Sequence, residues 1–221
     1  FELRSAKASL HIRTHMEMPD IVGLIEVEDL PTLQRLASRI STDADAAGQD
    51  DPLYTAYLIE GNDVGGIDVG YLVKTAGGRV TSVTVTQELD GSVLDNPDGS
   101  TSTLHDRPPL MLRAVVNGPG GATYPVTVIL NHLRSLNDIA STDAGTFGWP
   151  TVGDRVRAKR LAQAVDLANF VQARQAADPA ERIIVMGDMN AFEVNDGYVH
   201  SMGTITGQAY LSSDTLVDTP L

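Results

Sequence analysis

The sequence predicts an α+β fold in which helices cover a pair of mixed or mainly antiparallel sheets. Apolar runs of strand length alternate with amphipathic helical segments near both ends of the chain. Between them, short apolar runs separated by Gly-, Asn- and Asp-rich turns indicate successive hairpins. A chain of 221 residues fits one large domain or two small ones, and we predict one domain over residues 1–221.

The first helix is expected over residues 1–18, because Leu3, Ala6 and Leu10 recur at spacings of three and four. Residues 20–27 (DIVGLIEV) form an apolar run with little alternation. Such a run is typical of a strand that is covered on both faces. The chain therefore begins with the order helix, buried strand.

A second helix is expected from Pro31, since proline suits the first turn of a helix. Its core face is predicted to contain Leu33, Leu36, Ala37 and Ile40. Further strands are expected over residues 54–59, 66–74, 80–86, 110–116 and 125–131. Two segments rich in turn residues, 87–109 and 134–153, are expected to be long loops.

A long helix is predicted from an N-cap at Asp154 to about Ala177. Its core face is expected to contain Val156, Leu161, Val165, Ala168 and Val171. Residues 182–186 then follow as another buried strand.

The charge balance excludes one mode of nucleic acid binding. Sixteen Lys and Arg stand against 29 Asp and Glu, a net charge of -13, which is the wrong sign for binding a polyphosphate by counterion release. An acidic enzyme that holds Mg²⁺ or Ca²⁺ through carboxylates can still act on phosphates, because the ion inverts the local electrostatics. The chain has no cysteine, which excludes disulfides and thiolate sites. No apolar run approaches the ~20 residues of a membrane-spanning helix, so we expect no stable membrane insertion.

Polar residues that suit hydrolytic chemistry follow three predicted strands. Glu26 closes one, Asn131 and His132 close another, and Asp188 and Asn190 follow a third. Carboxylates supply hard oxygen ligands for a metal ion, and an imidazole transfers protons near neutral pH. Each residue alone has a simpler explanation. Glu26 would be a solvated acid at the end of a strand, and His132 a hydrogen-bonded histidine at the rim. Asp188 and Asn190 would form an Asx turn.

Five stretches together resemble the endonuclease/exonuclease/phosphatase superfamily, and most closely its predicted extracellular nucleases of bacteria. They are DIVGLIEVED (20–29), GIDVGYLVK (66–74), DRPPL (106–110), VILNHLRS (128–135) and IIVMGDMNAFE (183–193). The resemblance implies a four-layer α/β/β/α sandwich of two mainly antiparallel sheets. It also implies a secreted protein, in the extracellular or periplasmic space.

The resemblance further implies a role for each matching residue. Glu26 corresponds to the ligand of a metal, Mg²⁺ or Mn²⁺ with Ca²⁺ as an alternative. Catalytic roles fall on His132, Asp188 and Asn190, and substrate-binding roles on Arg107 and Asn131. The implied reaction is phosphodiester hydrolysis of a nucleic acid by in-line attack of an activated water.

Two features of the family have no counterpart here. The family has an asparagine near its first strand and an Asp-His pair near its C-terminus, whereas Asp-His occurs nowhere in this chain and Ser213-Asp214 is followed by Thr215. We therefore expect the first and last strands to be missing. General acid-base groups are worth ~10² to 10⁴ in rate, so we expect this chain by itself to be nearly inactive.

Two other functions stay open beside the nuclease. One is a phospholipid or inositol phosphate hydrolase of the same superfamily, which would act on a phosphorylated small molecule or lipid. The other is a catalytically inactive binding module. The loop at 135–153 does not distinguish a nucleic acid substrate from a lipid. It carries Phe147 and Trp149, as a lipid enzyme would, while the basic Arg155 and Arg157 that a nuclease would use follow just beyond.

Overall fold

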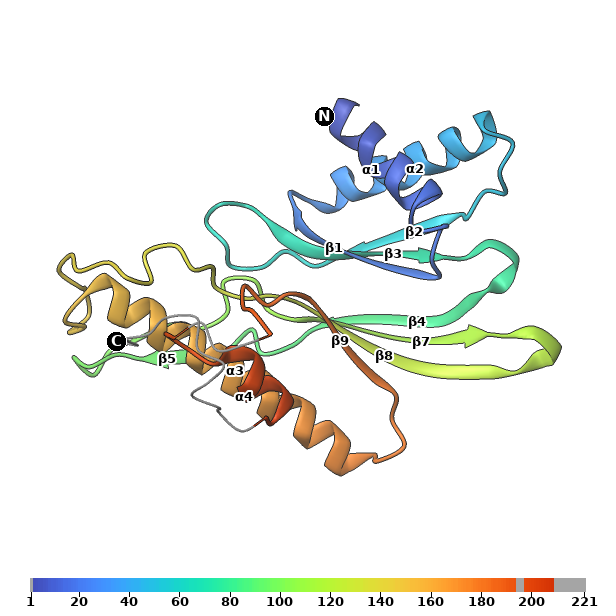
Figure 1. Ribbon diagram of the computed structural model, residues 1–221. Helices are drawn as coiled ribbons and strands as arrows, with labels where there is room; N and C mark the ends of the chain where they lie inside the picture. Colours follow the sequence, from blue (N-terminus) through green and yellow to red (C-terminus); the bar gives the residue numbers. More distant parts are fainter. Residues whose placement is uncertain (1, 194–196, 209–221) are drawn as a thin grey trace. The chain divides into compact units, whose positions relative to one another are not determined.

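The computed structural model describes residues 2–193 and 197–208 (Figure 1). These residues fall into two compact units, and each unit is described by itself. The first unit comprises the residues up to Glu88 together with Pro109–Asn131 and Arg182–Gly187. The second comprises Leu89–Pro108, His132–Glu181 and the described residues from Asp188 onward. The prediction of one domain over residues 1–221 stays a prediction.

The first unit holds two helices and two sheets. Its elements are α1 (Glu2–Thr14), β1 (Ile21–Val27), α2 (Leu30–Ala46), β2 (Tyr54–Leu58), β3 (Asp68–Lys74), η1 (Ala76–Gly78), β4 (Val80–Gln87), β7 (Leu110–Asn117), η2 (Pro119–Gly121), β8 (Thr123–His132) and β9 (Ile183–Asp188). One sheet has the strand order β1-β3-β2 and the other β4-β7-β8-β9. The last residues of β8 and β9 belong to the second unit.

Strand pairing is mainly antiparallel, as the sequence predicts. β3 pairs antiparallel with β1 and β2, and β7 pairs antiparallel with β4 and β8. β9 runs parallel to β8, because Thr127 N–H donates to the oxygen of Arg182 and Leu133 N–H to the oxygen of Asp188, so both partners advance in the same direction. The α+β class with mixed, mainly antiparallel sheets is confirmed.

β3 lies at the centre of the first unit and is buried along both faces. On one face, Val69, Tyr71 and Val73 pack in a cluster with residues of β4, β7 and β8. On the other face, Leu72 packs in a cluster with residues of α1, α2, β1 and β2. Successive side chains of a strand point to opposite faces, so one strand contributes to both layers of the core.

The second helix forms as its sequence predicts. Asp29 is the N-cap of α2 and accepts a hydrogen bond from Thr32 N–H at 2.7 Å, and Pro31 occupies the first turn. The four predicted core residues are buried, namely Leu33, Leu36, Ala37 and Ile40.

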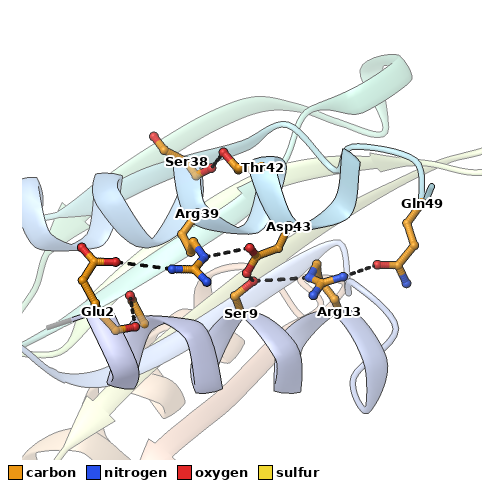
Figure 2. A network of polar contacts seen from close by, with 9 residues as sticks. Glu2, Ser9, Arg13, Ser38, Arg39, Thr42, Asp43 and Gln49 are labelled. Atoms are coloured by element: carbon orange, nitrogen blue, oxygen red, sulfur yellow. Dashed lines mark hydrogen bonds and ion pairs between the residues drawn. The ribbon is translucent and has the colours of Figure 1, made fainter. Parts of the chain in front are cut away.

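The predicted core face of the first helix is wrong. Leu3 and Leu10 are exposed by 71% and 52%, whereas Ser5, Ser9 and Ile12 are the buried residues of α1. Figure 2 shows the reason. α1 contacts a polar face of α2, and Ser9 donates from its hydroxyl to Asp43 at 2.7 Å.

That helix–helix contact continues as a chain of charges. Asp43 also accepts from Arg39 at 2.8 Å, and Arg39 reaches Glu2 of α1 at 3.4 Å (Figure 2). Hydrogen bonds and ion pairs therefore join α1 to α2 where the spacing of Leu3 and Leu10 predicts apolar packing.

The strands at 20–27 and 182–186 are less buried than predicted. β1 and β9 are each the edge strand of their sheet. Ile25 and Glu26 are exposed on β1, and Ile184 is half exposed on β9. An apolar run without alternation predicts a strand, but it does not reveal whether the strand lies in the middle of its sheet.

The second unit contains β5 (Val93–Asp95), β6 (Thr101–Thr103), α3 (Val152–Ala177) and α4 (Ser201–Thr206). The expected loop at 87–109 is corrected, because it carries the β5–β6 hairpin. The N-cap of α3 is Thr151 and not Asp154. Asp154 lies three residues after Thr151 and is its partner in a capping box. An acidic residue at the start of a helix suits this position as well as the N-cap.

Candidate functional site

The ends of β8 and β9 meet in the second unit. β8 ends at His132 and β9 at Asp188, and the N–H of the following Leu133 donates to the backbone oxygen of Asp188 at 3.0 Å. The two strand ends that carry the sequence-predicted polar residues are therefore adjacent.

Asp188 and Asn190 are held in a fixed turn. The carboxylate of Asp188 accepts from the backbone N–H of Asn190 at 2.7 Å, which is the Asx turn that the simpler interpretation expects. Asn190 has a φ of 47°, a left-handed conformation that asparagine tolerates. Its side-chain amide donates to the oxygen of Leu133 at 2.8 Å. This second bond goes beyond a turn, because it ties the segment after β9 to the segment after β8.

The glycine before Asp188 is required by the packing of the first unit. Gly187 has a φ of 122°, and a Cβ atom at this position would lie 2.0 Å from the backbone oxygen of Asn131. No residue with a side chain fits there without moving a strand.

His132 and Arg107 are brought together in the second unit. The Nε of Arg107 donates to the backbone oxygen of His132 at 3.2 Å, so the guanidinium lies at the end of β8. Arg107 is half-buried, and the side chain of His132 is buried. Four of the predicted site residues thus belong to one compact unit, and hydrogen bonds to backbone oxygens join their segments: Arg107, His132, Asp188 and Asn190.

Asn131 belongs to the first unit and is fully buried. Its side-chain amide donates to the oxygen of Ile129 at 3.0 Å, which fixes the end of β8. Its role in substrate binding stays a prediction.

Glu26 lies at a bulge in β1 of the first unit. The pairing with β3 passes from Leu24 opposite Gly70 to Val27 opposite Asp68, so β1 contains one extra residue. Glu26 has a φ of 56°, which is rare for a residue with a side chain. Bulges of this kind re-aim a side chain. The carboxylate is exposed, and Glu26 lines a pocket of about 600 Å³ together with Arg4, Leu24, Leu33 and Ile67.

A second acidic group of the first unit is engaged internally. Asp68 is buried and accepts from Gly61 N–H at 2.9 Å. The pKa of Glu60 is raised mainly by burial, and a hydrogen bond with Asp68 raises it further. Asp68, which lies in one of the matching stretches, thus closes the connection between β2 and β3.

Glu26 has the properties of a ligand for a hard metal ion. Among residues 2–193 and 197–208, no group of three or more His, Asp or Glu side chains is placed to hold an ion. Mg²⁺ usually binds one or two carboxylates and keeps several waters, so it does not need such a group. A single exposed carboxylate on a bulge fits this mode of binding.

The buried polar face of α3 was not predicted from the sequence. Leu161 and Val165, expected in the core, are exposed, whereas Lys159, Arg160 and Gln163 are buried. The signal was present in the sequence, because these three residues share the helical spacing of Val156, Ala164 and Leu167. Val156 and Ala168 of the predicted core face are buried as expected, so the apolar template is wrong at Leu161 and Val165.

Two buried bases of the second unit are paired with acids. Lys159 donates to both carboxylate oxygens of Asp106, at 2.8 and 2.7 Å, and burial lowers its pKa although Asp106 opposes the shift. His105 is fully buried with its Nε2 3.0 Å from Asp166, and burial lowers its pKa although Asp166 opposes the shift.

The loop at 135–153 is anchored rather than open at Trp149. The indole N–H of Trp149 donates to Asn96 at 3.0 Å, next to the β5–β6 hairpin. Phe147 stays half exposed, and the guanidinium of Arg155 lies 5.2 Å from its ring centroid. Ser213–Thr215, where the sequence departs from the family, lie outside the described residues.

Comparisons with known proteins find similarity only among solved structures. No protein-family model matches the sequence. No curated protein matches it. In the part of the chain that the structure describes, no helix is long and apolar enough to cross a membrane.

The solved structures that are similar to the chain include the following three. Truncated TDP2 of Caenorhabditis elegans has 21% identity and a TM-score of 0.48, over 86% of this chain and 57% of that one. ANGEL2, a 2′,3′-cyclic phosphatase, has 15% identity and a TM-score of 0.47, over 90% of this chain and 46% of that one. ANGEL2 in complex with adenosine-2′,3′-vanadate has 16% identity and a TM-score of 0.47, over 96% and 54%.

The chain thus spans about half the length of these proteins. At these identities and TM-scores, the likeness assigns neither a family nor an activity to the chain. The functional assignment rests on the residues of the site.

Proposed function

We propose that this protein is a metal-dependent phosphoesterase, and specifically an extracellular or periplasmic nuclease. The observation that supports this function best is the bond between Asn190 and Leu133, together with the bond between Leu133 and Asp188. These contacts join residues 187–190, the GDMN segment, to the end of the strand that carries His132. An isolated Asx turn would need neither contact.

The proposal gives each residue a task that its chemistry allows. Asp188 uses one carboxylate oxygen for the turn with Asn190, and a carboxylate has a second oxygen that accepts a proton from an attacking water. The amide of Asn190 has two N–H donors, one of which binds Leu133, and the other suits a phosphate oxygen.

His132 and Arg107 act on the phosphate and the leaving group. Imidazole exchanges protons near neutral pH, which suits a general acid for the leaving oxygen. A guanidinium fork matches the geometry of phosphate oxygens. Asn131, which is buried and directly precedes His132 in the sequence, is assigned a supporting role in substrate binding.

Glu26 is the residue that would hold the metal. A divalent cation supplies neutralisation of the charge that develops on the phosphate, which the net charge of -13 makes necessary. Phosphoryl transfer depends mostly on positioning and electrostatics, so no covalent nucleophile is required.

Hydrolysis of bis(4-nitrophenyl) phosphate by the full-length protein tests the reaction class. We expect turnover with Mg²⁺ or Mn²⁺, none with a chelator, and none in Glu26→Ala or Asp188→Ala. Circular dichroism must show that both variants fold. Turnover at the wild-type rate in either folded variant would contradict the role proposed for that residue.

Substrate class is tested by competition among three compounds. We expect the protein to cleave plasmid DNA in preference to sphingomyelin vesicles and inositol polyphosphates. A preference for the vesicles or the inositol phosphates would replace the nuclease with a lipid or inositol phosphate hydrolase. No turnover of any of them by a folded protein would favour a binding module.

Recovery of the protein from the cytoplasm alone would contradict the proposed location.

A further inference from the structure

The buried face of α3 includes charged and polar side chains beside its apolar ones, whereas a helix of this kind usually buries apolar side chains alone. Lys159, Arg160 and Gln163 are all buried. Among residues 2–193 and 197–208, Arg160 is the largest of the fully buried side chains, with 2% of its surface exposed. Burying charged and polar groups is costly unless each one is hydrogen-bonded. The partners of these three side chains therefore indicate why they are there.

Arg160 joins the two segments that follow β8 and β9. Its Nη1 donates to the backbone oxygen of Arg134 at 2.6 Å, and its Nη2 donates to the backbone oxygen of Asn190 at 2.8 Å. Both of these partners are carbonyl groups, so the two bonds fix the backbone. Arg134 lies two residues after His132, and Asn190 is a proposed site residue.

Gln163 and Lys159 extend the contact to a third segment. Gln163 accepts from Arg134 N–H at 2.8 Å and donates to the oxygen of Leu104 at 2.8 Å. Lys159 binds Asp106, the residue before Arg107. One helix face thus contacts the segments that carry Arg107, His132 and Asn190, all within the second unit.

We propose that the polar face of α3, defined as Lys159, Arg160 and Gln163, sets the spacing of these three segments, and that Arg160 is a positioning residue for phosphoester hydrolysis. This inference rests on the proposed function. Arginine is suited to the task, since its rigid planar fork donates in two directions at once, whereas lysine is a point charge on a flexible stem. Arg160 touches backbone oxygens and acts through Asn190 and His132.

The expected effect is on turnover more than on substrate affinity. A displacement of reacting groups by about 1 Å costs on the order of 10² in rate. Loss of an interaction that acts mainly in the transition state lowers kcat with KM little changed.

Arg157 provides a matched control on the same helix. Its Nη1 also donates to a backbone oxygen, that of Ile139, at 2.6 Å, and its Nη2 binds Asp154. Arg157→Met therefore removes a comparable contact between an arginine and a loop, but at a loop segment that carries none of the proposed site residues.

The experiment measures kcat and KM for bis(4-nitrophenyl) phosphate in full-length Arg160→Met, Arg160→Lys and Arg157→Met, with thermal unfolding alongside. We expect Arg160→Met to lose roughly 100-fold in kcat with KM changed less than about threefold. Arg160→Lys should lose at least about tenfold, because one ammonium does not reproduce the fork. If Arg160→Met does not fold, Arg160→Lys decides. Loss of kcat in Arg157→Met equal to that in the Arg160 variants would overturn the positioning role.

Hydrogen exchange separates this inference from the proposed function. The N–H groups of Leu133 and Asn190 both bind Asp188, at 3.0 and 2.7 Å. We expect both amides to exchange faster in Arg160→Lys than in Arg157→Met, at temperatures well below unfolding. Unchanged exchange would overturn the positioning role. Faster exchange in a protein whose wild type hydrolyses no phosphoester would leave the link between the segments standing and overturn the proposed function.

Discussion

The side-chain amide of Asn190 donates to the backbone oxygen of Leu133 at 2.8 Å, across 57 positions of the sequence. This bond brings the GDMN segment to the end of the strand that carries His132. Arg160 holds the same two segments from α3, since it donates to the oxygens of Arg134 and Asn190. The second unit therefore holds these strand ends through independent contacts.

Replacing Asn190 by aspartate should break this bond. Asn190→Asp keeps the size of the side chain and its tolerance of a left-handed backbone, but sets a carboxylate oxygen against the oxygen of Leu133. An unmatched buried acceptor costs about 1 to 3 kcal/mol, which urea unfolding measures. Asn137→Asp, the same charge change at an exposed position, should stay within about 0.5 kcal/mol of wild type. Equal stability of the two variants would show that the bond to Leu133 contributes nothing.

Replacing Gly187 by alanine should disrupt the pairing of β8 and β9. The added Cβ would lie 2.0 Å from the oxygen of Asn131, and the φ of 122° is strained for any side chain. We expect a loss of roughly 3 kcal/mol or failure to fold. Gly91→Ala is the control, because nothing lies within 4 Å of its added Cβ. A Gly187→Ala protein as stable as Gly91→Ala would contradict the close approach of the two strands.

Stability should depend on pH through His105. Burial lowers the pKa of His105 from its ordinary value of 6.5, so below that pH the unfolded chain binds more protons than the folded one. His105 therefore does not lower the free energy of unfolding above pH 6.5, and it lowers this free energy increasingly as the pH falls from there. Urea unfolding of wild type and His105→Gln between pH 7.5 and about 5 measures this, with exposed His15→Gln as control. An identical decrease in wild type and His105→Gln would exclude His105 as the cause.

Elements whose cores are apolar could be predicted from the sequence. The second helix was predicted because Leu33, Leu36, Ala37 and Ile40 follow the helical spacing and all pack into the core. β3 was predicted for the same reason, since its alternating side chains serve two apolar layers. In both cases local spacing and tertiary packing favour the same residues.

Helices that bury polar faces could not be predicted in this way. α1 buries Ser9 against Asp43, which also binds Arg39, and α3 buries Arg160 and Gln163. The partners of these side chains are distant in sequence, and several are backbone oxygens, which leave no signal in residue type. A search for apolar spacing therefore predicts that Leu3 and Leu10 of α1, and Leu161 and Val165 of α3, point inward, whereas all four are exposed.

The candidate site was predicted only as separate motifs. Glu26, His132 and Asp188 stand out because polar residues follow apolar runs, but spacing does not specify which strand ends are neighbours. The bulge that gives Glu26 a φ of 56° and the contact of Arg107 with the oxygen of His132 depend on the folded backbone. The residue types indicate which reactions the side chains can support, but they do not indicate how those side chains are placed relative to one another.

Nicking of supercoiled plasmid by the full-length protein, with and without Mg²⁺ or Mn²⁺ and with Asp188→Ala alongside, tests the central claim most directly. We predict nicking that requires the metal and disappears in Asp188→Ala, while circular dichroism shows the same fold. Absence of nicking by the folded wild type with metal, or nicking by Asp188→Ala at the wild-type rate, would contradict the claim that the GDMN segment belongs to a nuclease site.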